Sequence, residues 1–140
     1  MLRTVPGSAP APVVVAAHGA SQGGRSAPLY RHLADRLQRA GVETLLFDRR
    51  TTPGPGEIGI TPAVLAADLR AWVARLRAHP GLRPDVVALW GHSQGGWLVA
   101  DVAAADPGVA AVLAVSPSGQ PPAEQMAYAT ANPAARGGLR

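Results

Sequence analysis

The chain has 140 residues, enough for one domain with one hydrophobic core, and no apolar run in it approaches the ~20 residues of a membrane span. Its net charge is +4, but all 13 basic residues are arginines spread along the chain, which argues against nucleic-acid binding. It has no cysteine, which excludes disulfides, thiolate metal sites and a cysteine nucleophile. We therefore expect a soluble, cytoplasmic protein without membrane or nucleic-acid partners, and without a cofactor or a metal.

The first predicted elements are a tail, a strand and a helix. Residues 1–11 are rich in Pro and Ala and are expected to form a flexible N-terminal tail. The apolar run "PVVVAAHG" (12–19) ends at a glycine and predicts a buried strand. After a loop, a helix is predicted between Ser26, which can cap its start, and Gly41, which can end it. Its apolar residues recur every four positions, at Leu29, Leu33 and Leu37.

A second strand and a strongly patterned helix follow. The segment "VETLLFD" (42–48) predicts the strand. Thr61 is a natural N-cap with Pro62 at the first helical position, and His79-Pro80-Gly81 ends the helix. The apolar residues of this helix form one stripe: Leu65, Leu69, Trp72, Val73 and Leu76.

The second half of the chain repeats the alternation. "DVVALW" (85–90) predicts a third strand, a helix follows over 97–106, and "VAAVLAVS" (109–116) predicts a fourth strand. A last helical segment is expected over 122–132. Alternating strands and helices predict a three-layer α/β/α fold with a mostly parallel sheet of about four strands. The strands are continuous apolar runs, as in a sheet that is covered on both faces.

The pattern Gly-x-Ser-x-Gly occurs twice, around Ser21 and around Ser93. It is typical of a nucleophilic serine held on a sharp turn from a strand into a helix. After Ser93 the chain passes directly into the apolar segment "WLVADVAAAD", whereas the helix after Ser21 begins only at Ser26. We therefore predict that Ser93 is the nucleophile and that Ser21 lies in a loop. An ordinary turn is the alternative for the second motif, but the strand before it and the buried helix after it favour the nucleophile.

An acyl-transfer site also needs backbone N–H donors that point at the developing oxyanion. If the first and third strands are neighbours, the loop after the first faces the turn at Ser93, where ligands bind in parallel sheets. We predict the backbone amides of Ala20 and Gln94 as the two donors. The rest of the turn is formed by Gly91, His92 and Gly95.

The segments "HGA", "LLFDRR", "VVALWGHSQGGWLVA" and "VAAVLAVSPSG" resemble, in this order and spacing, the α/β-hydrolases. Within them the chain is similar to bacterial serine hydrolases of the dienelactone-hydrolase and prolyl-oligopeptidase types, over nearly its whole length from Pro12. The resemblance implies the strand order second, first, third, fourth. It also implies that the chain acts on an ester, lactone or amide bond of a small molecule through Ser93. The substrate itself is not indicated, and Trp90 and Trp97, which flank the turn, are expected in the core.

The resemblance further implies a triad in which an acid and then a histidine follow the serine. All four histidines precede Ser93, and His92, although adjacent to it, is expected to point its side chain elsewhere. The acids after Ser93 are Asp101, Asp106 and Glu124, none of them well placed. We therefore interpret the chain as a fragment of such an enzyme, whose hydrolytic activity alone should be near background.

The interpretation as a fragment gives the expected organisation. Residues 1–11 form the tail, 12–122 a partial α/β-hydrolase domain, and 123–140 the start of a lid or C-terminal segment. Apolar sheet edges would be exposed at 42–48 and 109–116, so we expect self-association.

Two other interpretations stay open. The loop "HGASQGGR" and the following Asp48-Arg49-Arg50 resemble the NAD(P)-binding segments of short-chain dehydrogenases. Against this, the last glycine of that fingerprint falls on Arg25, and the chain has no lysine for that family's Tyr-x-x-x-Lys pair. The second alternative is a hydrolase fold that binds a small ligand or partner without catalysis, which fits the missing histidine.

Overall fold

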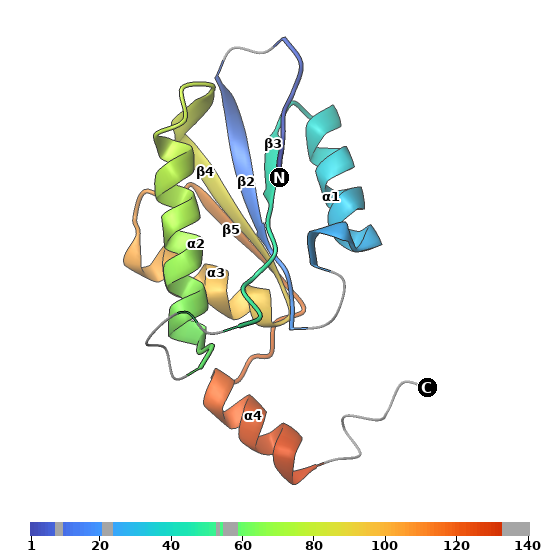
Figure 1. Ribbon diagram of the computed structural model, residues 1–140, viewed down its shortest axis with the longest axis vertical. Coiled ribbons are helices and arrows are strands. Elements are labelled where there is room, and N and C mark those ends of the chain that lie inside the picture. Colours follow the sequence, from blue (N-terminus) through green and yellow to red (C-terminus); the bar gives the residue numbers. More distant parts are fainter. Residues whose placement is uncertain (8–9, 21–23, 53, 55–58, 133–140) are drawn as a thin grey trace.

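A five-stranded, mostly parallel sheet forms the centre of the fold (Figure 1). The structure is a computed structural model that describes residues 1–7, 10–20, 24–52, 54 and 59–132. The strands are β1 (Leu2–Arg3), β2 (Ala11–Ala17), β3 (Glu43–Leu46), β4 (Leu82–His92) and β5 (Ala111–Val115). They lie in the order β1-β3-β2-β4-β5, with β1 antiparallel to β3 and the other pairs parallel. The order of the last four strands is the predicted one.

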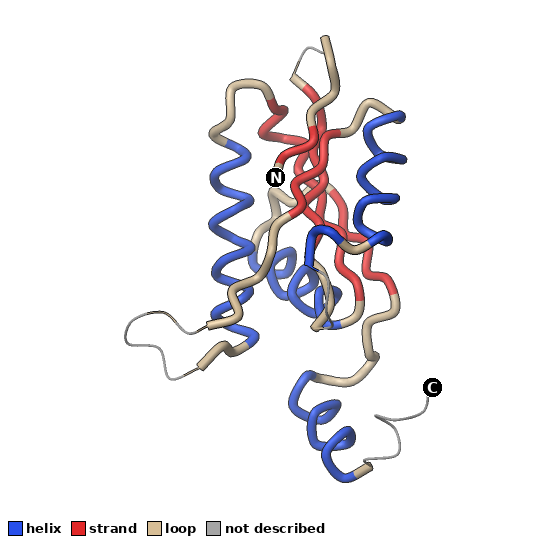
Figure 2. The backbone as a smooth tube through the Cα atoms, turned by 45° about the vertical axis from the view of Figure 1, so that its right-hand side comes forward, coloured by secondary structure: helices blue, strands red, loops and turns tan. Residues whose placement is uncertain are grey.

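Helices cover both faces of this sheet and make three layers. They are α1 (Pro28–Arg39), α2 (Pro62–Arg77), α3 (Gln94–Ala105) and α4 (Pro122–Ala131), and a short 3₁₀ turn, η1 (Gly24–Ser26), precedes α1. Helix α1 lies on one face, α2 and α3 lie on the other, and α4 lies beyond the carboxyl ends of the strands (Figure 1, Figure 2). Because side chains alternate along a strand, Val14 and Ala16 enter the core under α1, whereas Val13 and Val15 enter the other core. The three-layer α/β/α prediction is confirmed.

Helix α2 follows its sequence pattern closely. The Thr61 hydroxyl accepts a hydrogen bond from the backbone N–H of Val64 at 3.3 Å, which is the predicted cap. The predicted Ser26 cap of α1 is not formed, because that helix starts after Ala27 and has no side-chain cap. Four of the five residues of the predicted α2 stripe are buried, and the fifth packs partly against them: Leu65, Leu69, Val73 and Leu76, with Trp72.

Helix α1 turns a different face to the sheet from the one that its leucine spacing predicts. Leu29 is 44% exposed, whereas Tyr30 and Ala34 are buried. Leu33 and Leu37 are only partly buried against the same core. The helix is therefore rotated so that Tyr30 points at the sheet, close to the carboxyl ends of β2 and β4.

Strand β1 lies in the segment 1–11, for which the sequence predicts only a tail. Its Leu2 packs against the core, and Arg3 forms an ion pair with Asp35 of α1 at 2.6 Å. These contacts hold the strand against β3, so part of the edge at 42–48 that we expected to be exposed is covered. A two-residue strand is too short to show a period in the sequence, and the sheet begins before residue 12.

The opposite edge of the sheet, at β5, is open. All five of its residues are exposed, including Val112, Leu113 and Val115. No charged residue and no proline occurs between Val109 and Val115, although such residues usually protect natural sheet edges. The expected exposed edge at 109–116 is therefore present in the described part of the chain.

We expect this edge to make the protein self-associate, and Leu113→Lys to shift it toward the monomer. Leu113 is 50% exposed, so the added charge costs little in the monomer but opposes the pairing of two edges. Sedimentation velocity over a concentration series measures the effect. Leu29→Lys, at an exposed leucine on α1, is the matched control and should leave association unchanged; equal association in both variants would contradict the role of the edge.

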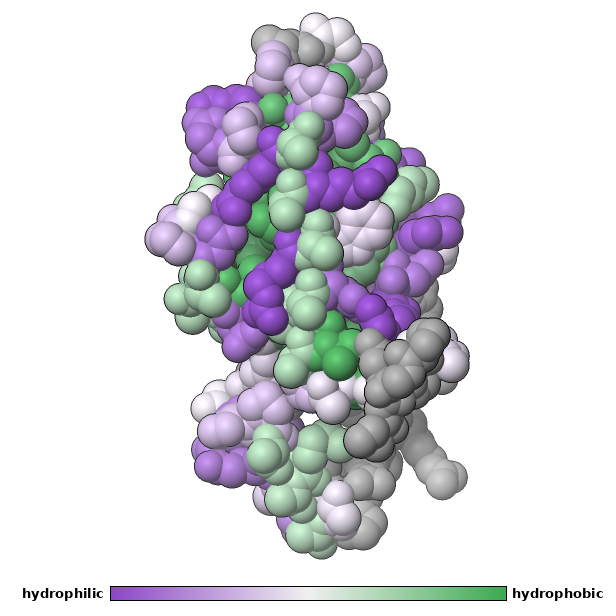
Figure 3. Space-filling view, turned by 60° about the vertical axis from the view of Figure 1, so that its left-hand side comes forward, coloured by the Kyte–Doolittle hydropathy of each residue, from purple (hydrophilic) through white to green (hydrophobic). Residues whose placement is uncertain are grey.

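Arginine and aspartate side chains pair helix α2 with the segment after β3 and with α3. The pairs are Arg50–Asp68, Arg70–Asp101 and Arg77–Asp106. Figure 3 shows hydrophilic residues spread over the face in view rather than gathered in one patch. All six side chains of these pairs keep a quarter or more of their surface exposed, so each pair contributes about 1 kcal/mol at most and the two cores carry most of the stability. Within the described ranges, no helix is both long enough and apolar enough to cross a membrane.

Candidate active site

Ser93 lies at the junction of β4 and α3 in an unusual backbone conformation. Its φ is 52° and its ψ is −121°, a region that non-glycine residues rarely adopt and that costs ~1–3 kcal/mol. Its backbone N–H donates to the Val115 carbonyl of β5 at 2.9 Å, and its carbonyl accepts from the Gly96 N–H at 2.8 Å. The chain thus makes a sharp turn from strand into helix, held by β5 on one side and by the helix on the other.

Two glycines allow this turn because side chains would collide with backbone there. A Cβ on Gly95 would lie 2.8 Å from the carbonyl carbon of Ala17 in β2, and closer still to its oxygen. A Cβ on Gly91 would lie 2.5 Å from the carbonyl carbon of Gly95. The spacing Gly-x-Ser-x-Gly is therefore what lets β2, β4 and α3 approach closely around Ser93.

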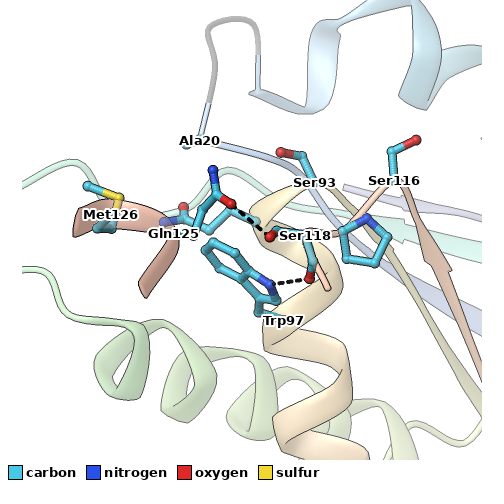
Figure 4. A pocket seen from close by; sticks show the side chains of 9 residues that line it. Ala20, Ser93, Trp97, Ser116, Ser118, Gln125 and Met126 are labelled. Carbon is cyan, nitrogen blue, oxygen red and sulfur yellow. Dashed lines mark hydrogen bonds between the residues drawn. The ribbon is translucent and has the colours of Figure 1, made fainter. Parts of the chain in front are cut away.

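The loop after β2 lies against the same turn. A Cβ on Gly19 would lie 3.2 Å from the Cβ of Ser93, which is tighter than an ordinary contact. Ala20 follows Gly19, and Ala20, Ser93 and Gln94 line one cavity of about 490 Å³ (Figure 4). The fold thus brings together the three residues that the sequence predicts as nucleophile and oxyanion donors.

Gln94 is the first residue of α3, so its backbone N–H belongs to the helix N-terminus. The first N–H groups of a helix lack intrahelical acceptors and favour negative charge beside them. The Gln94 side chain is held by Arg49, whose guanidinium donates to its Oε1 at 2.5 Å. Burial lowers the pKa of Arg49. Arg49 thus holds the side chain of a residue that lines the cavity.

Neither histidine near Ser93 is arranged as its base. Both ring nitrogens of His18 are engaged: Nε2 accepts from the backbone N–H of Arg49 at 3.1 Å, and Nδ1 lies 2.8 Å from the Gly19 carbonyl. The His92 ring stacks on Trp90 with an interplanar angle of 18°, away from the cavity-lining residues. The other two histidines are exposed, on α1 and at the end of α2: His32 and His79.

The acids that follow Ser93 are engaged elsewhere or lie on α4. Asp101 pairs with Arg70 at 3.3 Å, and Asp106 pairs with Arg77 at 2.6 Å. The hydrogen bond from Arg77 lowers the pKa of Asp106, consistent with a structural carboxylate. Glu124 lies in the first turn of α4 and is not among the residues that line the cavity.

One wall of the cavity was not predicted. Trp97, which we expected in the core, lines it, and its indole N–H donates to the Ser118 carbonyl at 3.1 Å (Figure 4). The Ser118 hydroxyl donates to Gln125 Oε1 at 2.8 Å. Ser118 therefore links Trp97 of α3 to Gln125 of α4. Trp90, by contrast, is buried under α1 as expected.

The first Gly-x-Ser-x-Gly motif cannot be compared with the second, because Ser21 lies outside the described residues. In the described residues that follow, η1 (Gly24–Ser26) precedes α1, which starts at Pro28. A dinucleotide-binding loop passes from strand to helix at its last glycine, and this chain does not follow that pattern at Arg25.

Comparisons with known proteins agree with this fold. Residues 14–140 match the model of the alpha/beta hydrolase family. Among curated proteins, thiohydrolase apmlB of Arthrinium phaeospermum is 32% identical over 96 residues, which are 66% of this chain and 31% of that protein. Polyketide transferase ATR5 of Stachybotrys chlorohalonatus is 34% identical over 85 residues, 59% of this chain and 29% of that protein.

Solved structures show the same relationship. The alpha/beta hydrolase GrgF of Penicillium sp. sh18 superposes with a TM-score of 0.72 at 27% identity, covering 96% of this chain and 48% of that one. Dienelactone hydrolase of Anabaena variabilis superposes with a TM-score of 0.69 at 29% identity, covering 83% of this chain and 56% of that one. The chain spans less than a third of the curated relatives and about half of these structures.

Proposed function

Because residues 14–140 match its family model, the chain belongs to the alpha/beta hydrolase family, and we propose that Ser93 is the nucleophile of an acyl-transfer reaction. The observation that carries the proposal is the conformation of Ser93, a non-glycine residue with φ of 52° at a helix N-terminus that lines a cavity. Strained residues of this kind cluster at active sites, where the surrounding structure holds them in place.

In the proposed reaction, the Ser93 Oγ attacks the carbonyl carbon of a substrate bound in the cavity. The carbonyl oxygen becomes an oxyanion, which the backbone N–H groups of Ala20 and Gln94 would stabilise together with the N-terminus of α3. The tetrahedral intermediate then expels the alcohol, thiol or amine and leaves an acyl group on Ser93. Water hydrolyses this ester and restores the serine.

The proton of the Ser93 hydroxyl needs a base, and the described histidines do not supply one. In serine hydrolases that lose a triad member, the oxyanion donors and substrate binding alone leave ~10³–10⁴-fold catalysis over water. We therefore expect this chain by itself to acylate slowly with activated substrates and to turn over ordinary esters far more slowly than a hydrolase with a complete triad.

The substrate class that we propose is an ester or thioester of a small acid. Two curated relatives are named a thiohydrolase and a polyketide transferase. The cavity offers both an apolar wall for a carbon chain, from Trp97 and Met126, and polar groups, from Ser118 and Gln125. Helix α4, which carries Met126 and Gln125, would act as a lid over Ser93.

Added imidazole should accelerate the acylation of Ser93 by p-nitrophenyl acetate, because it supplies the base that the described histidines do not provide. The measurement is the rate of one stoichiometric burst of p-nitrophenol as a function of imidazole concentration. Ser93→Ala is the control, because it measures the direct reaction of imidazole with the ester, which is then subtracted. A wild-type burst no larger than that of Ser93→Ala would contradict the proposed nucleophile. If no burst from Ser93 is seen but the protein binds a small ligand tightly, the alternative of a binding protein without catalysis would be favoured.

A further inference from the structure

We propose that Tyr30 is a positioning residue that holds the oxyanion loop against the Ser93 turn. The effect of Tyr30 on catalysis rests on the proposed function, in which Ser93 is the nucleophile. Tyr30 lies on α1, outside the cavity, and is 6% exposed. Its hydroxyl is therefore a buried polar group whose position is set by its partners.

The Tyr30 hydroxyl contacts both segments of the site. It accepts a hydrogen bond from the backbone N–H of Gly19 at 3.1 Å, in the loop after β2. It also lies 3.4 Å from Nδ1 of His92, the residue before Ser93. Since the amide donates to the phenol oxygen, the phenol's own proton is available to point at His92. One side chain thus bridges two segments that are far apart in the sequence.

Aromatic contacts fix where this hydroxyl lies. The Tyr30 ring meets Trp90 of β4 edge-on, with centroids 5.9 Å apart and an interplanar angle of 85°. It also contacts the rings of His18 and His92, with centroids 6.0 Å and 6.4 Å away. Trp90 and His92 both belong to β4, so the phenol is packed against the sheet, and the loop that carries His18 and Gly19 lies against it.

The loop has little freedom on its other side. Gly19 packs so closely on Ser93 that a Cβ there would lie 3.2 Å from the serine Cβ. Gly19 is therefore held between the Tyr30 hydroxyl and the turn. Because Ala20 follows Gly19 directly, the position of Gly19 also sets the direction of the Ala20 backbone N–H. A donor must lie within a few tenths of an ångström of its productive position, and a misplacement of about 1 Å can cost ~10²-fold in rate.

Tyr30→Phe tests this role, because it keeps the ring and removes only the hydroxyl. We expect hydrogen exchange of the Gly19 amide to become at least ~10-fold faster once its acceptor is lost. The amides of Val14 and Val15 in β2 report global opening and should be unchanged. Tyr128→Phe is the matched control, at the other tyrosine of the chain, which is 59% exposed on α4. It should change neither the exchange of the Gly19 amide nor that of Val14 and Val15.

Acylation by p-nitrophenyl acetate is the second measurement on the same variants. We expect Tyr30→Phe to lower the acylation rate constant of Ser93 by ~10–100-fold while the half-saturating ester concentration stays the same, since oxyanion donors act on the transition state. A merely structural role would instead accelerate exchange throughout β2.

The two measurements separate the inference from the proposed function. Unchanged Gly19 exchange in Tyr30→Phe would overturn the inference, whatever the acylation rates are. Faster Gly19 exchange with an unchanged acylation rate would also overturn it, because holding the loop would then make no difference to the acylation of Ser93. If Ser93 is not acylated even in the wild type, the proposed function fails, and the inferred role in catalysis fails with it. Gly19 exchange would still show whether Tyr30 holds the loop.

Discussion

Gly95→Ala should lower the free energy of unfolding by about 3 kcal/mol or more, the upper range for an overpacked site. The new methyl group would meet the carbonyl group of Ala17, which is backbone in the middle of the sheet and cannot rotate away. Either β2 or the start of α3 must move, and both position the predicted site. We therefore also expect the acylation of Ser93 to be lost. Urea denaturation and the p-nitrophenol burst measure the two effects.

Gly119→Ala is the matched control for this substitution. Gly119 lies in the segment between β5 and α4, and a Cβ there meets no atom within 4 Å. Its φ lies outside the left-handed region, so alanine should change stability by no more than about 0.5 kcal/mol. Similar stability for Gly95→Ala and Gly119→Ala would mean that α3 does not approach β2 as closely as described.

Ser93→Gly should stabilise the protein while it abolishes acylation. Glycine relieves a backbone strain of ~1–3 kcal/mol at φ of 52°, and it adds ~0.5–1 kcal/mol of entropy to the unfolded chain. The expected net gain is about 1 kcal/mol in the free energy of unfolding, with no acyl adduct at this position. Urea denaturation and intact-mass spectrometry after incubation with p-nitrophenyl acetate measure both.

Ser93→Ala separates the two causes, because alanine removes the hydroxyl and keeps the strain. It should lose the adduct like Ser93→Gly but show no comparable gain in stability. A protein that is less stable with glycine than with alanine at this position would contradict the strained conformation. A strained serine that costs stability and supplies a nucleophile is the trade-off expected of a catalytic site.

Local patterns predicted most of the fold. The strand order followed from a resemblance carried by short motifs, and the start of α2 followed from Thr61 and Pro62 alone. The geometry at Ser93 was also predictable, since only glycine fits at positions 91 and 95 when a helix follows a strand this closely. The residues that signal the start of α2 and the turn at Ser93 each lie within one short segment of the sequence.

The parts that sequence could not predict depend on partners far along the chain. The inward face of α1 includes Tyr30 because its hydroxyl meets Gly19 and His92, and no spacing of leucines reports that. Trp97 lines the cavity because its indole bonds to Ser118, which the fold brings back beside α3. Strand β1 was missed because a two-residue strand has no period to detect.

The location of the acyl group after reaction with p-nitrophenyl acetate tests the central claim most directly. Tandem mass spectrometry of the digested protein can distinguish Ser93 from Ser116 and Ser118, which are the other serines among the described residues that line the cavity. We expect one acetyl group per chain, on Ser93, formed faster when imidazole is present. Acetyl groups distributed over several serines, or absent from Ser93 while others react, would contradict its role as the nucleophile.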